Sequence, residues 1–371
     1  MLKIGIVSAY NPHIDKKAHS GILNKINNAL ENANCETIWI KNSTPLSYKI
    51  LGKVAKLFNL IFKKNIYIDR TYVGSYLLAS TINKKLIEKC DYIMVIHYFH
   101  VLYWLKTNKP IIYHSDATFE IIDDYYIFDL WNWNKKQAEN IEKKVLNKAT
   151  LHLSSSDWRN NSVINHYKIS SSLCKVLEYG PCIDIEKIDI EKKETLQLLF
   201  LAVEWERKGG DIAVETCEIL NELGIKTVIN IVGIKEIPSS CVGKEFVNFV
   251  GYLNKNDLKQ YQILQSILKT TDFLVLPTKA ECSAVVYTEC AAYGIPVITY
   301  DTGGVGNYVI NGLNGYRLPL SSDAKDFANK IKEILDTNQF EKLSKGGLKI
   351  YKEKLNWNNW TKEFLIYFNK K

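Results

Sequence analysis

Short apolar runs alternate with longer amphipathic stretches along the whole chain. Apolar runs of about four to eight residues between turn-forming residues are typical of buried strands in parallel sheets. The candidate strands of the first half are LKIGIVSA, TIWI, YIMVIHYF, PIIYHSD, LHLSSS and a last one within HYKIS…KVLEYGPCID. Those of the second half are LQLLFLAV, TVINIVG, VNFVGYL, FLVLP, PVITY and GYRLP. Helical stretches separate them, so the pattern predicts an α/β protein built from βαβ units.

A polar, charged segment divides this pattern into two halves. We interpret residues 183–195 as a linker, because charged side chains dominate them and no apolar run crosses them. The first domain is then 1–182 and the second 196–355, each a doubly wound, Rossmann-like unit, with a central cleft between them. The last residues, 356–371, contain WNNWTKEFLIYF and are predicted to form a helix.

Composition narrows the class of protein. With 371 residues, 46% hydrophobic and 24% charged, the chain suits a globular protein with two full cores. No apolar run approaches the roughly 18 residues of a membrane span, and MLKIGIVSAYNP reads as a strand rather than a signal peptide. The eight cysteines include no C-x-x-C pair, so we expect reduced thiols, a cytoplasmic location and no zinc site. The first strand lacks a GxGxxG, which argues against a dinucleotide oxidoreductase.

Two glutamates eight residues apart, Glu281 and Glu289, stand where open α/β sheets bind ligands. Glu281 follows the strand FLVLP, on the loop at its carboxyl end. Glu289 falls within a helix predicted from about Val285 to Tyr293, which Gly294 and Pro296 end. The carboxylates are therefore expected near the start of one helix and about two turns further along it.

The start of this helix offers chemistry for a nucleotide. Its unpaired N–H groups and partial positive charge favour a phosphate. Ser283 and Ala284 are small, so a ligand could approach the backbone closely. The Glu289 carboxylate can accept two hydrogen bonds from a vicinal diol such as ribose. On spacing alone, two solvated surface glutamates remain an equal alternative.

Segment 281–299 resembles the signature of the retaining glycosyltransferases of family 4, which have the GT-B architecture. The signature is a Glu, seven residues, a second Glu, small residues and a Gly-x-Pro-Val strand, in the order found here. The resemblance implies that Glu281 contacts donor sugar hydroxyls and that Glu289 holds the nucleotide ribose. The family usually has Gly at the positions of Cys282 and Ala284, which leaves the shape of this loop open. The other predicted donor-binding residues of this domain are Tyr252, Leu253, Ser283, Ala284 and Val285.

A second motif lies upstream, in LQLLFLAVEWERKGGDIAVETCEILNELG, which reads as strand, basic loop and helix. Arg207 and Lys208 occupy the loop, where two cations can neutralise a departing nucleoside diphosphate. The family has a Lys-Gly here, with an Arg five residues before the Lys. That earlier position is Val203 in this chain, so the Lys carries over and the role of Arg207 stays open. A solvated turn is the alternative.

Two segments of the first half resemble weaker motifs of the family. HSGILNKINNALEN resembles the loop whose backbone faces the diphosphate, and Gly21 has no Cβ to obstruct such an approach. PIIYHSD ends where the family often has a His that contacts the donor sugar. Counting from Pro110, Asp116 takes that position, and His114 lies two residues earlier on the same face. An ordinary loop glycine and a packed core histidine are the alternatives.

The segment between Lys41 and Lys64 holds six lysines and no acidic residue, in a chain of net charge +8. An apolar helical stripe runs through it, consisting of Val54, Leu57, Phe58 and Ile61. The lysines elsewhere around the same helix are Lys49, Lys53, Lys56 and Lys63. Such a helix can lie on an anionic membrane surface. It can also pack its apolar face inward, whereas nucleic-acid binding lacks a recognised module.

The resemblance implies a retaining, metal-independent glycosyltransferase that moves a sugar from a nucleotide-sugar donor to a glycan or lipid-linked glycan. We expect no cofactor, since no Asp-x-Asp pair stands out to hold a metal, and we place the reaction in bacterial polysaccharide or lipopolysaccharide synthesis. The final helix resembles the family helix that crosses back to the first domain. The expected catalytic residues are His114, Asp116, Arg207, Lys208 and Glu281. The alternatives are a GT-B phosphorylase, a nucleotide-sugar epimerase and a non-catalytic scaffold at a membrane surface.

Overall fold

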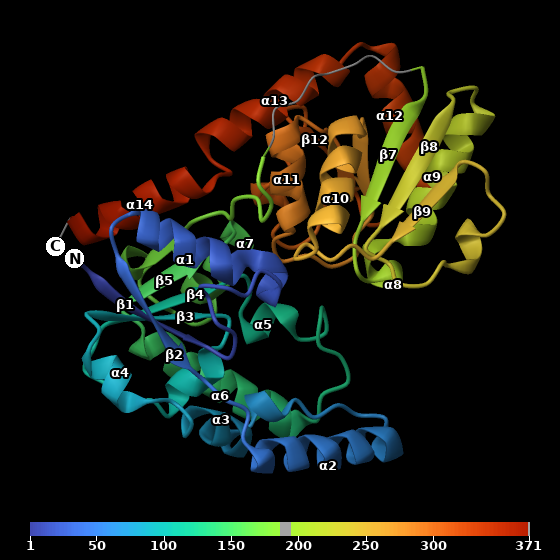
Figure 1. Ribbon diagram of the computed structural model, residues 1–371. Helices are drawn as coiled ribbons and strands as arrows, with labels where there is room; N and C mark the ends of the chain where they lie inside the picture. Colours follow the sequence, from blue (N-terminus) through green and yellow to red (C-terminus); the bar gives the residue numbers. More distant parts are fainter. Residues whose placement is uncertain (186–193, 370–371) are drawn as a thin grey trace. The chain divides into compact units, whose positions relative to one another are not determined.

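The computed structural model describes residues 1–185 and 194–369. The chain clusters into two compact units, the first of residues 1–177 with those from Thr361 onward, and the second of residues 178–360. Each unit is built on one six-stranded sheet (Figure 1). The linker predicted at 183–195 lies mostly outside the described residues, and the predicted domain boundaries stay predictions.

Unit 1 contains a fully parallel sheet in the order β2-β1-β3-β4-β5-β6. Its strands are β1 (Lys3–Ser8), β2 (Glu36–Lys41), β3 (Tyr92–Ile96), β4 (Ile111–Ser115), β5 (Leu151–Ser154) and β6 (Cys174–Val176). The strand expected over YIMVIHYF ends at Ile96, because His97 takes a left-handed φ of 62°. The apolar residues that follow form a short 3-10 helix, η3 (Phe99–Tyr103).

Helices cover both faces of this sheet, with α1 on one side and α3 and α6 on the other (Figure 1). The core on the α3 and α6 side includes Leu78, Val95 and Val145, all less than a tenth exposed. The helices are α1 (Ile22–Asn32), α2 (Leu46–Phe62), α3 (Tyr72–Ala79), α4 (Lys84–Glu88), α5 (Phe119–Ile122), α6 (Asn132–Lys148) and α7 (Asp157–Asn165). Short 3-10 helices are η1 (Ala18–Gly21), η2 (Ile68–Arg70) and η4 (Ser171–Leu173).

The last helix, α14 (Trp357–Asn369), contributes residues to both units. Within unit 1, the Thr361 hydroxyl lies 3.4 Å from the carbonyl oxygen of Ala29, to which it donates. The Tyr367 hydroxyl donates to the carbonyl oxygen of Thr150 at 3.1 Å. The ring of Phe368 meets that of Tyr92 edge-on. These contacts hold this part of α14 against unit 1.

Unit 2 contains a second fully parallel sheet, in the order β12-β11-β10-β7-β8-β9. The order reverses at β7, and such a reversal marks the ligand-binding edge of a doubly wound sheet. Its strands are β7 (Leu196–Leu201), β8 (Thr227–Val232), β9 (Val247–Gly251), β10 (Phe273–Leu276), β11 (Val297–Tyr300) and β12 (Gly315–Leu318). The expected α/β class with two doubly wound parallel sheets is confirmed.

The helices of unit 2 also form two layers, since α9 contacts α12 and α11 contacts both α10 and α13. They are α8 (Trp205–Lys208), α9 (Gly210–Glu222), α10 (Leu258–Thr270), α11 (Val285–Tyr293), α12 (Ala324–Asp336) and α13 (Phe340–Glu353), with 3-10 helices η5 (Ser239–Cys241) and η6 (Val305–Asn307). The predicted helix from Val285 to Tyr293 has the expected bounds, and Gly294 ends it with a φ of 64°. That left-handed conformation suits a residue without a Cβ.

Of the two alternatives for the apolar stripe of α2, inward packing is wrong. Its apolar stripe does not pack inward, because Val54, Leu57 and Ile61 are 46%, 57% and 63% exposed. Only Ala55 is buried within the helix. Among the described residues, no helix combines the length and apolar character that crossing a membrane requires. All eight cysteines are buried free thiols.

Candidate functional site

The loop between β10 and α11 is the centre of the site in unit 2. It runs from Pro277 to Ala284 along the carboxyl edge of the sheet, and Glu281 lies within it. The Thr278 hydroxyl donates to the carbonyl oxygen of Ala280 at 2.9 Å. The backbone N–H of Gly304 donates to the carbonyl oxygen of Glu281 at 3.0 Å. The loop is thus held rigidly from within and from the turn after β11.

Arg207 ties this loop to α8. Its guanidinium donates to both carboxylate oxygens of Glu204, at 2.8 and 2.9 Å, and to the carbonyl oxygen of Ala280 at 2.8 Å. Its own carbonyl oxygen accepts from the backbone N–H of Lys279 at 2.9 Å. Arg207 therefore joins two segments that are distant in the sequence. A role at a phosphate, as the sequence suggested, stays a prediction.

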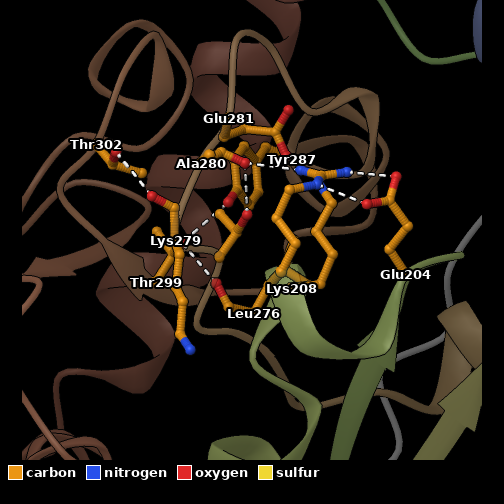
Figure 2. A network of polar contacts seen from close by, with 11 residues as sticks. Glu204, Lys208, Leu276, Lys279, Ala280, Glu281, Tyr287, Thr299 and Thr302 are labelled. Carbon is orange, nitrogen blue, oxygen red and sulfur yellow. Dashed lines mark hydrogen bonds and ion pairs between the residues drawn. The ribbon is translucent and has the colours of Figure 1, made fainter. Parts of the chain in front are cut away.

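Lys208 forms an ion pair with Glu281, and Figure 2 shows the two side chains next to each other. The two side chains are only 12% and 7% exposed. A pair so little exposed is weakly screened by salt, so the charges fix each other's position. The pair brings together two residues that the sequence assigned to the site.

Glu289 lies further along α11 and is 2% exposed. Its carboxylate pairs with the Lys255 ammonium at 3.0 Å. Burial opposes the charge on this ammonium, but the Glu289 carboxylate, with smaller contributions from Cys182 and Tyr252, outweighs burial and raises the pKa of Lys255. Two Lys–Glu pairs thus flank the first two turns of α11. Tyr252 and Leu253, which the sequence also assigned to the donor, lie just before Lys255, and Tyr252 is 46% exposed.

The N-terminus of α11 has unused hydrogen-bonding capacity. Ala284, its N-cap residue, provides no side-chain cap, and no acidic residue lies in the first turn. The Ser283 hydroxyl is buried and has no hydrogen-bond partner among the described residues. Val285 begins the helix and is 7% exposed. A hydroxyl and uncapped N–H groups beside a lysine are the donor set that an anionic group such as phosphate requires.

In unit 1, Asp116 follows β4 directly and pairs with His97. The Asp116 carboxylate lies 3.2 Å from Nδ1 of His97, and the His97 ring lies 4.6 Å from that of His19. Burial would raise the pKa of Asp116, but His97, together with His19 and a backbone hydrogen bond, outweighs burial and lowers that pKa to about 2. Burial, together with the charge of His97, lowers the pKa of His19 to about 4. At neutral pH the cluster therefore presents one carboxylate beside a neutral His19.

The other predicted residues of unit 1 are placed differently. His114 is fully buried, and burial lowers its pKa far below the usual range. Gly21 is the N-cap residue of α1 and has a φ of 96°, which glycine adopts readily. His19 and Ser20 before it also have positive φ, at 51° and 59°. Three consecutive residues of this kind make a tight loop whose backbone is strained before α1 begins.

Four residues of these clusters were not singled out from the sequence: His19, His97, Glu204 and Lys255. His97 directly follows β3, and Lys255 follows β9 by four residues. Both residues could have been found from their position after the carboxyl end of a predicted strand, since ligands bind at that edge of the sheet. The apolar run YIMVIHYF hid the true end of β3, because residues after His97 are also apolar. The described residues contain no group of three or more His, Cys, Asp or Glu placed to hold a metal ion.

The architecture defined by these two sheets is that of GT-B glycosyltransferases. Sucrose-phosphate synthase from Thermosynechococcus elongatus superposes with a TM-score of 0.70 and 16% identity, over 100% of this chain and 99% of that one. HepE from Anabaena, in complex with UDP and glucose, gives a TM-score of 0.67 at 14% identity over the whole of both chains. The lipopolysaccharide outer core galactosyltransferase WaaB gives 0.62 at 14% identity, again over both whole chains.

The match to a family model lies within the second unit. Residues 183–349 match the family described as glycosyl transferases group 1. An uncharacterized glycosyltransferase of Methanocaldococcus jannaschii is 28% identical over 31% of this chain and 35% of its own length. An uncharacterized 41.2 kDa protein in the cps region of Klebsiella pneumoniae is 24% identical over 57% of this chain. That match spans 58% of the Klebsiella protein, so the chain covers only part of the relatives it resembles.

Proposed function

We propose that the protein is a retaining glycosyltransferase of family 4 that uses a nucleotide-sugar donor. The observation that carries this proposal is the Lys208–Glu281 pair beside the uncapped start of α11. A diphosphate placed there would meet the Lys208 ammonium, the Ser283 hydroxyl and the first N–H groups of α11. Negative charge grows on the leaving diphosphate during transfer, and a prearranged cation stabilises that charge.

The remaining residues of unit 2 would hold the rest of the donor. Glu281, displaced from Lys208 by the diphosphate, would accept hydrogen bonds from sugar hydroxyls. Glu289, paired with Lys255, would accept hydrogen bonds from the ribose hydroxyls. Arg207 would act by positioning the loop through Ala280. The Lys208 ammonium and the start of α11 would stabilise the charge on the leaving group, and we propose transfer without a metal or another cofactor.

Unit 1 would supply the acceptor side of the reaction. Asp116 and His97 would contact the sugar near the reacting carbon, and the backbone around Gly21 would face the diphosphate. We propose a glycan or lipid-linked glycan acceptor in bacterial polysaccharide or lipopolysaccharide synthesis. The support comes from similar proteins, one in a cps region and one that is a lipopolysaccharide galactosyltransferase. HepE, whose structure contains UDP and glucose, supports the use of a nucleotide-sugar donor.

The decisive experiment measures nucleoside diphosphate binding with the Glu289→Ala variant. UDP, GDP, ADP and dTDP are screened by thermal shift, since a ligand at about 100 times its Kd adds about 2.7 kcal/mol of stability. Glu289→Ala should weaken binding of the best nucleotide by about 1–3 kcal/mol, the cost of losing hydrogen bonds to a charged group. Calorimetry with the same nucleotide gives the Kd of each variant.

Lys279→Ala is the control variant. Lys279 lies on the same loop as Glu281, between β10 and α11, but its side chain points away from Glu281 in Figure 2. It should bind the nucleotide like the parent. Equal affinity in Glu289→Ala and the parent, with intact folding, would remove Glu289 from the site. Sugar transfer that persists in EDTA and keeps the anomeric configuration of the donor is also expected. Nucleotide binding without any transfer would favour a scaffold instead.

A further inference from the structure

Helix α2 leaves an unusual amount of apolar surface exposed. Five aliphatic side chains at helical spacings of three and four residues form one row, which we call the α2 stripe. The α2 stripe consists of Leu46, Ile50, Val54, Leu57 and Ile61, which are 73%, 53%, 46%, 57% and 63% exposed. Leu60, beside it, is 80% exposed. Single exposed aliphatic residues are ordinary on protein surfaces, but a continuous row along a whole helix marks an interaction site.

The opposite side of α2 already packs against unit 1. Ala55 is 4% exposed, and the helix contacts α3 and η2. Ala55 lies about 180° around the helix from Leu46 at about 100° per residue. The α2 stripe therefore faces away from the domain to which the helix is attached. It is a second apolar face, separate from the core-facing one.

A row of lysines runs beside the α2 stripe. Lys49, Lys53 and Lys56 each precede a stripe residue by one position, so they lie about 100° around the helix. Lys63 directly follows the last residue of α2, and all four lysines are exposed. Within residues 1–185 and 194–369 these lysines form no ion pair, and no acidic residue occurs from 41 to 64. The charge of this surface is thus left for an external anion.

Aromatic side chains extend the surface beyond the end of the helix. Phe58 stacks on Phe62 at 5.7 Å between ring centres, and Phe62 meets the Trp131 ring edge-on at 5.7 Å. The Asn65 amide donates to the carbonyl oxygen of Phe128 at 2.9 Å, and Phe128 is 51% exposed. Aromatic rings of this kind are enriched at membrane–water interfaces, where one side is apolar and the other wet.

We propose that α2 docks unit 1 on an anionic phospholipid membrane. The α2 stripe enters the outer part of the acyl-chain region, and the lysine row binds the headgroups. A helix with both features lies in the interface plane, and its binding adds apolar burial to electrostatic attraction. A second copy of the chain fits less well, because two lysine rows would meet with no acidic partner on either helix. The inference is independent of the donor site, since α2 belongs to the other unit.

The test is sedimentation of the full chain with lipid vesicles. The parent should bind vesicles of phosphatidylcholine with phosphatidylserine and should not bind phosphatidylcholine alone. The triple variant Ile50→Gln, Leu57→Gln, Ile61→Gln should lower the partition coefficient at least about tenfold, equal to about 1.4 kcal/mol. Replacing Lys49, Lys53, Lys56 and Lys63 by Gln should lower it about as much and should remove its dependence on salt.

Two matched controls come from unit 2. One replaces four lysines of α13 by Gln, which changes the net charge equally: Lys342, Lys345, Lys349 and Lys352. The other replaces three exposed aliphatic residues by Gln: Val242, Leu258 and Leu320, which are 62%, 70% and 55% exposed. Both should retain vesicle binding, and all variants should keep the thermal midpoint of the parent, because exposed residues contribute little to stability.

Several outcomes would overturn the proposal. A parent protein that does not sediment with anionic vesicles would end it, and so would an equal loss of binding in the α13 control. Self-association that depends on concentration and disappears in the stripe variant would assign the surface to a second copy. Failure of the donor proposal would leave the vesicle result unchanged, because nucleotide binding is measured separately.

Discussion

Asp116 keeps its charge in a setting that ordinarily removes it. Burial favours the neutral carboxylic acid, yet His97, His19 and a backbone hydrogen bond together outweigh burial and bring the pKa of Asp116 to about 2. The carboxylate is therefore ionised throughout the physiological range. His19, with a pKa lowered to about 4, is neutral in the same range. A fixed anion beside neutral imidazole is suited to accept hydrogen bonds from sugar hydroxyl groups.

Substitution of Asp116 by Asn tests this role at the residue scale. Asn keeps the shape and removes the charge, so the turnover number for sugar transfer should fall by about a hundredfold, as for loss of a prearranged electrostatic group. UDP affinity should stay within about twofold of the parent, because Asp116 is assigned to the donor sugar and not to the nucleotide. Steady-state kinetics and calorimetry measure the two quantities.

His114→Ala is the companion variant, because His114 precedes Asp116 by two residues and is fully buried. Loss of its ring should leave a cavity and lower the thermal midpoint more than the turnover number. If His114 proved essential for transfer and Asp116 dispensable, the assignment of the sugar contact to Asp116 would be wrong. A collapse of UDP affinity in both variants would contradict the division of work between the units.

At the scale of elements, a glycine at the α8–α9 junction positions Lys208. Gly209 has a φ of 73°, and a Cβ at this position would lie 2.2 Å from the carbonyl oxygen of Pro277. The junction can thus approach the end of β10 only without a side chain. This close approach brings Lys208 to Glu281 across 73 residues of sequence. The glycine after Lys208 is therefore required because any side chain at position 209 would collide with Pro277.

The variant Gly209→Ala should destabilise unit 2 and weaken UDP binding together. An alanine at positive φ costs about 1–2 kcal/mol, and the contact with Pro277 adds to this cost. Gly243→Ala is a matched control, because Gly243 also has a φ of 73° and nothing within 4 Å of its added Cβ. The control should lose stability from backbone strain alone and should bind UDP normally. Equal effects of the two substitutions on UDP affinity would contradict the steric explanation.

At the scale of the whole molecule, buried histidines tie stability to pH. Four of the seven histidines have a lowered pKa, with burial as the main cause: about 4 for His19 and His100, about 3 for His152, and far below the usual range for His114. The unfolded chain takes up protons on them below about pH 6.5, whereas the folded chain does not until about pH 4. Each of these groups therefore destabilises the fold as the pH falls through that window.

One buried group acts in the opposite direction. Burial raises the pKa of Glu142 to about 7, against the opposing charges of Arg70 and Arg159. The folded carboxyl group takes up its proton below about pH 7, but the unfolded one does so only near pH 4.5. Glu142 thus increases the stability of the folded state as the pH falls from 7 toward 4.5. It offsets about one of the four histidines over this range.

The thermal midpoint should accordingly fall as the pH is lowered from 7 to 5. Each uncompensated histidine contributes up to about 1.4 kcal/mol per pH unit. His152→Leu should flatten the dependence, because His152 is fully buried and burial is the main cause of its lowered pKa. Calorimetric unfolding at several pH values measures the slope. A midpoint that is constant or rises toward pH 5 would contradict the assignment of neutral histidines to the folded state.

The sequence by itself determined the local elements and the class of fold. Apolar runs such as FLVLP and PVITY predicted β10 and β11, because a strand buried on both faces needs consecutive apolar side chains. The periodicity from Val285 to Tyr293, with Gly294 after it, gave α11 with its observed bounds. Glu281 and Glu289 were recognisable because their spacing and surroundings lie within one continuous segment.

Only the tertiary structure decided which side chains meet. Lys255 reaches Glu289, and His97 reaches Asp116, from strand ends that are separate in the sequence. The order of parallel strands sets such pairings, and no local periodicity encodes that order. The exposure of the α2 stripe was likewise undecided, since an amphipathic pattern is the same whether its apolar row meets a core or faces outward. Burial depends on the elements packed around a helix, and that packing exists only in the folded chain.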